Sequence, residues 1–270
     1  MAVIGAAFGA GMIVGPMLGG VLSAFDEKLP FYAVAALAAA NWALAFWRLP
    51  ESRPRELASP GTFELWRALV PTPLRLIAAV HERRVGLFLY LFFHLFTAFA
   101  VLESLITLYV AARFGATMLD VGLLFAWIGL VLVLTQGVAL RRLVRWLDEA
   151  HLVALGLAAM GVGLALVPAL PGFGWFYAAG ALIAFGNGIA IPAFTSLFSK
   201  ACRSDRTGEL MGESQAMATT GRIVGPVCGG YLMQSVAPGA PFLAAGAMML
   251  AALALFRAAR AILVVPEIAP

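Results

Sequence analysis

The chain has 270 residues, of which 62% are hydrophobic and only 12% charged, and its mean hydropathy is +0.94. Ordinary soluble domains are about half apolar and about a quarter charged. The core of a soluble protein could not bury this many apolar residues, so the composition excludes a water-soluble protein. The net charge of +4 does not indicate nucleic-acid binding, because the basic residues lie in short loops between apolar runs.

Eight long apolar runs follow one another along the chain, each close to the length of about 20 residues that a helix needs to cross a bilayer. They are residues 2–25, 30–48, 85–111, 119–140, 151–170, 175–198, 211–234 and 242–260. Backbone groups in hydrocarbon must bond within their own segment, and the alternating pattern of membrane β-barrel strands does not occur in the sequence. The predicted fold is therefore an all-α, polytopic bundle of membrane helices.

A ten-residue element occurs twice in the chain. Residues 11–20 read GMIVGPMLGG and residues 221–230 read GRIVGPVCGG, with seven of ten positions identical. A duplication inside such an apolar chain is typical of transporters, whose halves are built from repeats. Several predicted spans precede the second copy, whereas the first copy begins close to Met1, so we expect an N-terminally truncated transporter.

Lys and Arg are distributed unevenly among the connections between spans. The connections 26–29, 112–118, 171–174 and 235–241 hold only Lys28 and Arg113. The segments 48–84, 141–150, 199–210 and 257–270 hold 15 of the 18 basic residues. Because short cytosolic loops are enriched in Lys and Arg, the second set is expected to face the cytosol, together with both chain ends.

The stretch 49–84 is the only long connection between predicted spans. Within it, residues 62–70 place Phe63 and Trp66 at helical spacing beside charged side chains, which predicts a helix lying along the membrane surface. A flexible linker with a few apolar residues is the alternative. The expected domains are the last two helices of an N-terminal bundle over 1–48, this cytosolic linker, and a six-helix bundle over 85–270.

Three features together resemble the major facilitator superfamily. They are the two copies of the GP-containing element, the sequence Leu49-Pro50-Glu51-Ser52 after the second span, and the long basic central loop. The nearest likeness is to bacterial drug:proton antiporters, including the tetracycline-efflux group. The resemblance implies that the predicted spans are helices five to twelve of a twelve-helix transporter.

The resemblance assigns the repeated element to the antiporter motif of this family. Its positions are Gly11, Gly15, Pro16, Gly19 and Gly20 in the first copy and Gly221, Gly225, Pro226, Gly229 and Gly230 in the second. The basic-loop motif of the family, GxxxDRxGR, falls on Gly137, Arg142 and Arg145, with Arg141 in place of Asp and Val144 in place of Gly. Such degeneracy is usual for the second half of these proteins, so the better copy is expected in the missing first four helices.

The glycines of each copy recur every four residues, a spacing that clears one helix face for the close approach of another backbone. The prolines remove a backbone donor and kink each helix beside the cleared face. One interpretation is helix packing alone. The other, compatible with the first, is a surface along which the two halves of a transporter slide and seal.

Three charged or titratable residues, His94, Glu103 and Arg222, lie at membrane depth. Such side chains are costly inside a bilayer, so each is expected to have a partner or a function. The family resemblance implies that the span 85–111 borders the central cavity, where Glu103 would take up and release a proton. His94 is either a substrate or coupling residue or a hydrogen-bonded packing residue.

Polar residues on the span 85–111 form a stripe that is a candidate substrate contact. Tyr90, His94, Thr97 and Ser104 fall within about 40° of one helical direction, whereas Glu103 lies on another face.

Arg222 and one further polar residue, Asn187, lie inside two other predicted spans. Arg222 lies near the middle of the span 211–234, one turn before Pro226. Arginine stays protonated, so it cannot carry a proton and needs a carboxylate or free carbonyl groups, such as those that the proline leaves unbonded. Asn187, between two glycines of the span 175–198, is expected to face the same cavity if the tenth helix of the family is a guide.

No sequence pattern indicates an enzyme. The GxxxxGK[ST] loop of ATP-binding proteins does not occur, and Val85 occupies the second histidine position of a zinc-protease pattern that begins at His81. Cys202 and Cys228 lie in different environments and indicate neither a disulfide framework nor a metal site. No cofactor or metal is expected.

The favoured function is proton-coupled efflux of small amphipathic compounds by alternating access in the cytoplasmic (inner) membrane. The expected partners are the lipid bilayer, a small-molecule substrate and protons, and the protein is expected to be a monomer that binds no nucleic acid. An uptake carrier of the same superfamily is the main alternative. A non-transporting membrane scaffold or remnant is the second.

Overall fold

The fold was analysed in a computed structural model of the whole chain. The structure describes residues 28–48, 83–201 and 207–263, and the single residues 11, 14, 15, 18, 19, 22, 25 and 26. Every regular element within these residues is helical, which confirms the predicted all-α class. The predicted surface helix over 62–70, most of the span 2–25, and the motif residues Pro16 and Gly20 lie outside the described residues.

The described helices follow the predicted spans closely. They are α2 (Leu29–Arg48), α5 (Arg83–Phe114), α6 (Met118–Leu134), the π-helical turn η2 (Thr135–Ala139), α7 (Leu140–Leu143), α8 (Glu149–Leu166), the 3₁₀ turn η3 (Val167–Ala169), α9 (Trp175–Ala201), α10 (Thr207–Ser235), α11 (Ala240–Ala258) and α12 (Arg260–Leu263).

Local sequence accounts for several of the helix ends. Thr117 caps α6 with its side chain. The Asp120 carboxylate in turn accepts a hydrogen bond from the Thr117 backbone N–H over 2.8 Å, which completes a capping box. Asp148 caps α8 by accepting the His151 backbone N–H over 2.7 Å. Gly115 has a φ of 65° after the end of α5, a conformation that glycine adopts without a Cβ clash.

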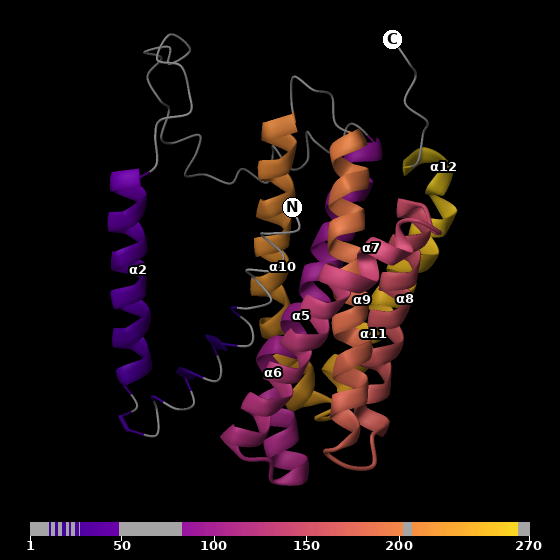
Figure 1. Cartoon of the computed structure of the whole chain (residues 1–270). Coiled ribbons are helices and arrows are strands. Elements are labelled where there is room, and N and C mark those ends of the chain that lie inside the picture. The colour runs from indigo at the N-terminus through magenta and orange to yellow at the C-terminus, as the bar shows by residue number, and fades with distance from the viewer. Residues whose placement is uncertain are drawn as a thin grey trace.

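Six of the described helical segments are long and apolar enough to cross a membrane, judged by length and composition. They are Leu29–Arg48, Arg84–Phe114, Met118–Leu143, Glu149–Ala169, Trp175–Ala201 and Ala240–Ala258. The 29-residue helix α10 is long enough but is not among them, because Arg222 and many glycine and hydroxyl residues lower its hydropathy. It nevertheless runs alongside the apolar helices in Figure 1.

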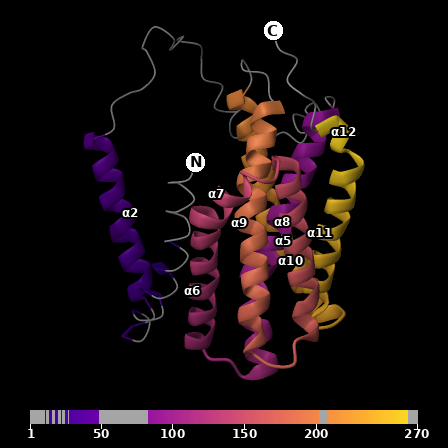
Figure 2. The same ribbon diagram turned by 45° about the vertical axis from the view of Figure 1, so that its right-hand side comes forward.

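The helices from α5 to α11 form one bundle. The largest contacts are those of α5 with α10 and of α8 with α9, and α11 packs on both α8 and α5. α2, in indigo, stands apart from the bundle in both Figure 1 and Figure 2, and none of its residues is buried. Large apolar side chains of α2 are therefore exposed, including Phe31 at 75% and Trp47 at 83%.

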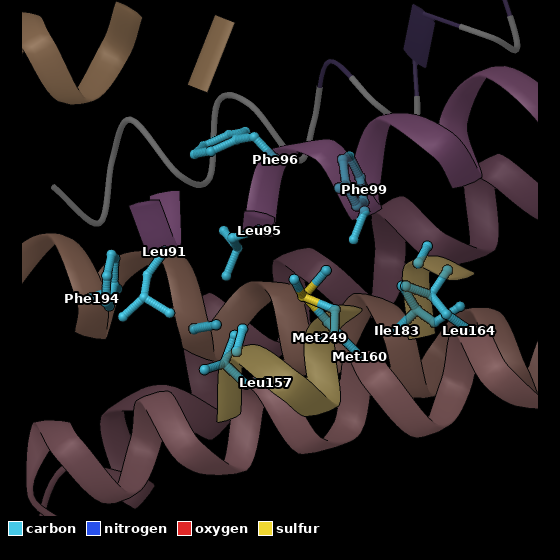
Figure 3. Close-up of a cluster of buried hydrophobic side chains, with 14 of the residues drawn as sticks. Leu91, Leu95, Phe96, Phe99, Leu157, Met160, Leu164, Ile183, Phe194 and Met249 are labelled. Carbon is cyan, nitrogen blue, oxygen red and sulfur yellow. The ribbon is translucent and has the colours of Figure 1, made fainter. Parts of the chain in front are cut away.

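The core of the bundle is apolar and joins helices that are distant in sequence. Leu91 and Leu95 of α5 lie beside Leu157 and Met160 of α8 and Met249 of α11 in one cluster (Figure 3). Aromatic rings extend this cluster between α5 and α9: the Phe88 ring centroid lies 5.2 Å from that of Phe194 and 5.3 Å from that of Phe198.

The basic ends of the described helices lie on one side of the bundle. Figure 1 and Figure 2 show α7, α12 and the C-terminal ends of α2 and α9 at one end, and the turns after α5, η3 and α10 at the other. The described basic residues at the first end are Arg48, Arg84, Arg141, Arg142, Arg145, Lys200, Arg257 and Arg260. This arrangement matches the alternation of basic and non-basic connections, and the cytosolic location of the basic end remains a prediction.

The second glycine repeat lies inside the bundle. A Cβ atom on Gly221 or Gly225 would lie 2.7 Å from the backbone oxygen of Phe93 or Thr97 in α5, respectively, so the two helices require glycine there. Gly229 faces Leu105 of the same helix. These three glycines therefore pack two helices of the same bundle together, and a sliding surface between two halves of a transporter remains a prediction.

The glycines of the first repeat have a different environment. A Cβ atom on Gly11, Gly15 or Gly19 would have none of the described residues within 4 Å, and the same holds for Gly230 in the second repeat. Close helix packing is therefore present only in the second copy, within the described residues.

Candidate substrate and proton site

The neighbours of α5 define where each of its faces points. Successive helical residues are about 100° apart, so a side chain that touches a known helix sets the direction of that face. Phe92 packs on Phe194 of α9, with ring centroids 4.8 Å apart, and Thr97 faces α10. Phe96 and Glu103 point between these two directions. The face of α5 that carries Glu103 thus opens between α9 and α10.

Glu103 is exposed on this face, although it lies within the membrane-length segment Arg84–Phe114. Its neighbour Ser104 is also exposed, and Thr107 is half-buried one turn further along. Among the described residues, no basic side chain lies within 4.0 Å of the Glu103 carboxylate. A charged side chain on an exposed helix face at membrane depth is costly, which marks Glu103 as a candidate functional residue.

Arg222 contributes a positive charge to the same opening. Its guanidinium carbon lies 5.2 Å from the centre of the Phe96 ring, which places the cation over the aromatic face. Because α5 and α10 run in the same direction, Glu103 lies seven residues, or about 10 Å, further along α5 than this contact. Arg222 and Glu103 therefore share one face of the bundle without forming an ion pair.

Tyr90 and His94 lie on a different face of α5. Thr97 faces α10, and Tyr109 packs on Phe242 of α11 with ring centroids 5.1 Å apart, so His94 points between α10 and α11. The His94 Nδ1 atom lies 2.8 Å from the Tyr90 carbonyl oxygen, and the two rings are 4.0 Å apart. This pair is a local packing unit on the face away from Glu103.

Thr97 is buried in the contact between α5 and α10. Its hydroxyl donates to the Phe93 carbonyl oxygen over 2.7 Å, and only 7% of the residue is exposed. The stripe predicted from helical periodicity is therefore interrupted at Thr97, because α10 covers that face, whereas Tyr90 and Ser104 remain exposed.

Asn187 is buried at 2% exposure in α9 rather than lying on the open face. The adjacent glycines explain its burial: a Cβ on Gly186 would strike the Gly156 carbonyl oxygen of α8, and one on Gly188 would strike Thr135 at the start of the π-helical turn. The Asn187 side-chain oxygen has no hydrogen-bond partner among the described residues. No GP element marks the close crossing of α8 and α9, so the repeated motif could not predict it.

The basic-loop motif lies at the end of the bundle beyond α6. Gly137 falls in the π-helical turn, and Arg142 and Arg145 are exposed, as are Arg141 and Val144, which replace the Asp and Gly of the motif.

Periodicity did not reveal a polar cluster beside this loop. Asp148 accepts a bond from Arg260 over 3.0 Å and lies 2.6 Å from the His151 ring nitrogen. Glu149 accepts bonds from Ser196 over 2.6 Å and from Lys200 over 2.7 Å. The cluster ties the start of α8 to α12 and to the end of α9.

The pKa of Asp148 lies below its ordinary value. Partial burial raises the pKa, but the hydrogen bonds from His151 and the positive charges of His151 and Arg260 outweigh that effect. Asp148 is therefore an anion that bridges two helices at neutral pH.

The described residues contain no cluster of His, Cys, Asp or Glu that would hold a metal ion. What the geometry offers instead is an exposed carboxylate, an exposed guanidinium and an aromatic ring on one face of a membrane bundle.

The family model of the Major Facilitator Superfamily matches residues 1–212 and, a second time, residues 147–267. The chain belongs to the Major Facilitator Superfamily. The resemblance inferred from the repeated element is thereby confirmed, and the protein is a multi-pass membrane protein of a transporter family.

Relatives include proteins described as drug and tetracycline resistance proteins. Multidrug resistance protein 1 of Bacillus subtilis is 28% identical over 229 residues, a match that covers 84% of this chain and 56% of that protein. The class G tetracycline resistance protein of Vibrio anguillarum is 30% identical over 224 residues, covering 83% of this chain and 56% of the relative. The chain thus spans about half the length of the curated relatives it matches.

A solved structure shares the fold. The human organic anion transporter MFSD10 (TETRAN) superposes with a TM-score of 0.77 at 24% sequence identity, covering 95% of this chain and 62% of that one. At this level of identity the likeness establishes the architecture of the helices alone.

Proposed function

We propose that the protein is a secondary transporter that exports small amphipathic compounds in exchange for protons, by alternating access, in the cytoplasmic (inner) membrane. The observation that carries this proposal is the exposed carboxylate of Glu103 at membrane depth, on the face that opens between α9 and α10. The names of the relatives, multidrug and tetracycline resistance proteins, support efflux as the direction.

Glu103 is the proposed coupling residue. A carboxyl group in a low-dielectric site favours its protonated form, and access to water favours the ionised form. Alternating exposure of the site to the two sides of the membrane would therefore load and release a proton once per cycle. Arg222 faces the same opening and is the proposed substrate contact, whereas we assign the Tyr90–His94 pair and Thr97 to packing and Asn187 to the bundle interior.

The remaining assignments are part of the same proposal. The basic end of the bundle faces the cytosol, because Lys and Arg are retained on that side of bacterial membranes. The transporter works as a monomer and uses no ATP, cofactor or metal. The alternative is uptake by the same alternating-access mechanism, and a measurement of the direction of transport would distinguish uptake from export.

The proposal is tested by transport of rhodamine 6G in proteoliposomes, with and without an imposed pH gradient. The wild type should accumulate dye faster with the gradient, and Glu103→Gln should lose that acceleration, since glutamine keeps the shape and hydrogen bonding of glutamate but cannot titrate. His94→Gln, on the opposite face of the same helix, is the matched control and should keep it. A Glu103→Gln protein that folds normally and still responds fully to the gradient would refute Glu103 as the coupling residue.

A further inference from the structure

Arg222 is a cation whose hydrogen-bond donors have no acceptor within the part of the chain that the structure describes. Its one recorded contact is the stacking on Phe96, and among the described residues no acceptor oxygen bonds its guanidinium. A guanidinium carries five N–H donors in a planar fork that fits a carboxylate or a similar anion. A charge kept at membrane depth without an anionic partner is expensive, so this fork is positioned for an anion that comes and goes.

Arg113 shows what a structural arginine looks like in the same bundle. It also stacks on aromatic rings, with its guanidinium carbon 5.7 Å from the centre of Tyr109 and 5.3 Å from that of Phe114. In contrast to Arg222, its Nη1 atom donates to the Tyr109 hydroxyl and, over 2.6 Å, to the Pro168 carbonyl oxygen. Arg113 therefore ties the end of α5 to η3, whereas Arg222 presents its donors to the opening.

Phe96 orients the arginine. The ring lies at the edge of the core cluster, away from Leu157 and Met160 (Figure 3), and is only 9% exposed. Stacking on this ring holds one guanidinium face and leaves the in-plane N–H groups accessible from the side. The aromatic ring thus stabilises the cation at membrane depth without using any of its donors.

The surroundings of Arg222 suit an amphipathic ligand. On α10, Gln215 and Thr219 are exposed on the same face, and the Thr219 hydroxyl already donates to the Gln215 carbonyl oxygen over 2.9 Å. Ile223, beside Arg222, is 64% exposed and offers apolar surface. The site therefore combines one fixed positive charge with hydroxyl, amide and aliphatic groups.

The depth of Arg222 in the membrane indicates which kind of anion it binds, a transported compound or a lipid head group. Arg222 is 15 residues from Thr207 and 13 from Ser235, so it lies about 20 Å from each end of α10. A phospholipid phosphate remains at the membrane surface, beyond the reach of an arginine side chain extended toward it.

We infer that Arg222, held by Phe96, is the anion-binding group of the substrate site, and that the transported compounds include amphipathic organic anions with a carboxylate or sulfonate on an apolar body. This inference rests on the proposed transport function and specifies its substrate class. Cationic compounds of the same shape bind elsewhere in the opening or more weakly, because Arg222 repels them.

Two xanthene dyes of opposite charge test the inference. Fluorescein is an anion with a free carboxylate, and rhodamine 6G is a cation whose carboxyl group is esterified. Binding of each dye to the whole purified protein in detergent is measured by fluorescence anisotropy at neutral pH. Arg222→Gln should weaken fluorescein binding about tenfold or more, as expected for a charge-assisted bidentate contact, and leave rhodamine 6G binding unchanged or tighter.

The companion variants separate binding from folding. Arg222→Lys should bind fluorescein with intermediate affinity, because it keeps the charge but loses the fork and the planar stack. Phe96→Leu should also weaken fluorescein selectively. Arg113→Gln is the matched control and should not change the ratio of the two affinities; since that ratio is measured on each sample, a partial loss of folded protein does not affect it.

Equal affinity of wild type and Arg222→Gln for fluorescein would overturn the inference. So would an equal loss of both dyes in Arg222→Gln and in Arg222→Lys, because that result identifies a structural arginine. If rhodamine 6G is transported in response to the gradient but substitution of Arg222 does not change fluorescein binding, the inference about Arg222 is wrong and the proposed transport function stands. A wild type that binds and transports neither dye would contradict the proposed function as well.

Discussion

Single side chains at the basic end of the bundle join helices through charge. Asp148 caps α8 and also accepts a hydrogen bond from Arg260. One carboxylate therefore joins the start of α8 to the start of α12. Its side chain is 54% exposed, and water therefore screens both interactions. We expect a small contribution to stability whose sign follows from the lowered pKa.

Arg260→Gln should lower the thermal stability of the detergent-solubilised protein slightly at pH 7, by an amount typical of an exposed pair, about 0.2–1 kcal/mol. The pKa of Asp148 is lowered from its ordinary value of 3.8, so the stabilisation is complete above that value and is lost as the pH falls through the lowered pKa. Melting curves of variant and wild type at pH 7 and at pH 3 should therefore differ at the first pH and converge toward the second.

Arg257→Gln is the matched control, because Arg257 has no recorded ion pair within the described residues. It should melt like the wild type at both pH values. A gap between Arg260→Gln and the wild type that persists at pH 3 would contradict the role given to Asp148.

The sequence predicts which charged residues lie at membrane depth, but it does not predict which helices they face. Glu103 and Arg222 are visible as charges inside apolar runs. Which face each one occupies depends on how α5 and α10 cross, and this crossing placed Thr97 inside a contact that helical periodicity alone assigned to the open stripe. Asn187 was expected on the cavity from the family resemblance and is buried instead.

At the scale of the elements, close helix crossings at glycines organise the bundle, and two of them differ in how far the sequence predicts them. Glycines of α10 admit the backbone of α5, and Gly156 of α8 and Gly186 of α9 admit each other, with a Cβ on either one less than 3.0 Å from the other's carbonyl oxygen. The first crossing was predictable because its glycines repeat every four residues, whereas the second rests on single glycines in separate helices. The π-helical turn after α6 likewise has no signature in the sequence.

Gly225→Ala should destabilise the protein by about 1–3 kcal/mol, because the added methyl group would lie 2.7 Å from the Thr97 backbone oxygen and force the helices apart. Thermal melting in detergent, followed by size-exclusion recovery, measures the effect. Gly230→Ala, on the same helix but with no described residue within 4 Å of its added methyl group, should melt like the wild type. Equal melting of both variants would contradict the close crossing.

At the scale of the whole molecule, the described helices alternate in direction and collect their basic ends on one side (Figure 2). The alternation was predictable from loop charges, since these depend only on the order of apolar and basic segments. The family resemblance assigned α2 to a different bundle from residues 85–270, whereas the apolar sequence of α2 by itself gives no indication of which neighbour it meets.

Cysteine labelling tests the orientation of the protein in the membrane. In a Cys228→Ser background, Cys202 should react with a membrane-impermeant thiol reagent only after the cells are broken, because its segment is predicted to be cytosolic. Adding Ser235→Cys, at the opposite end of α10, should give a site that reacts in intact cells. The reverse pattern would invert the orientation.

The exchange of substrate for protons is tested most directly by the proton flux that substrate movement produces. Proteoliposomes of the protein are loaded with a pH-sensitive dye, and a rhodamine 6G gradient is imposed without any pH gradient. The account predicts that downhill dye movement drives protons in the opposite direction, that protein-free vesicles show no such flux, and that Glu103→Gln moves dye without moving protons. Dye movement through the wild type without a proton flux, or a proton flux that Glu103→Gln retains in full, would contradict it.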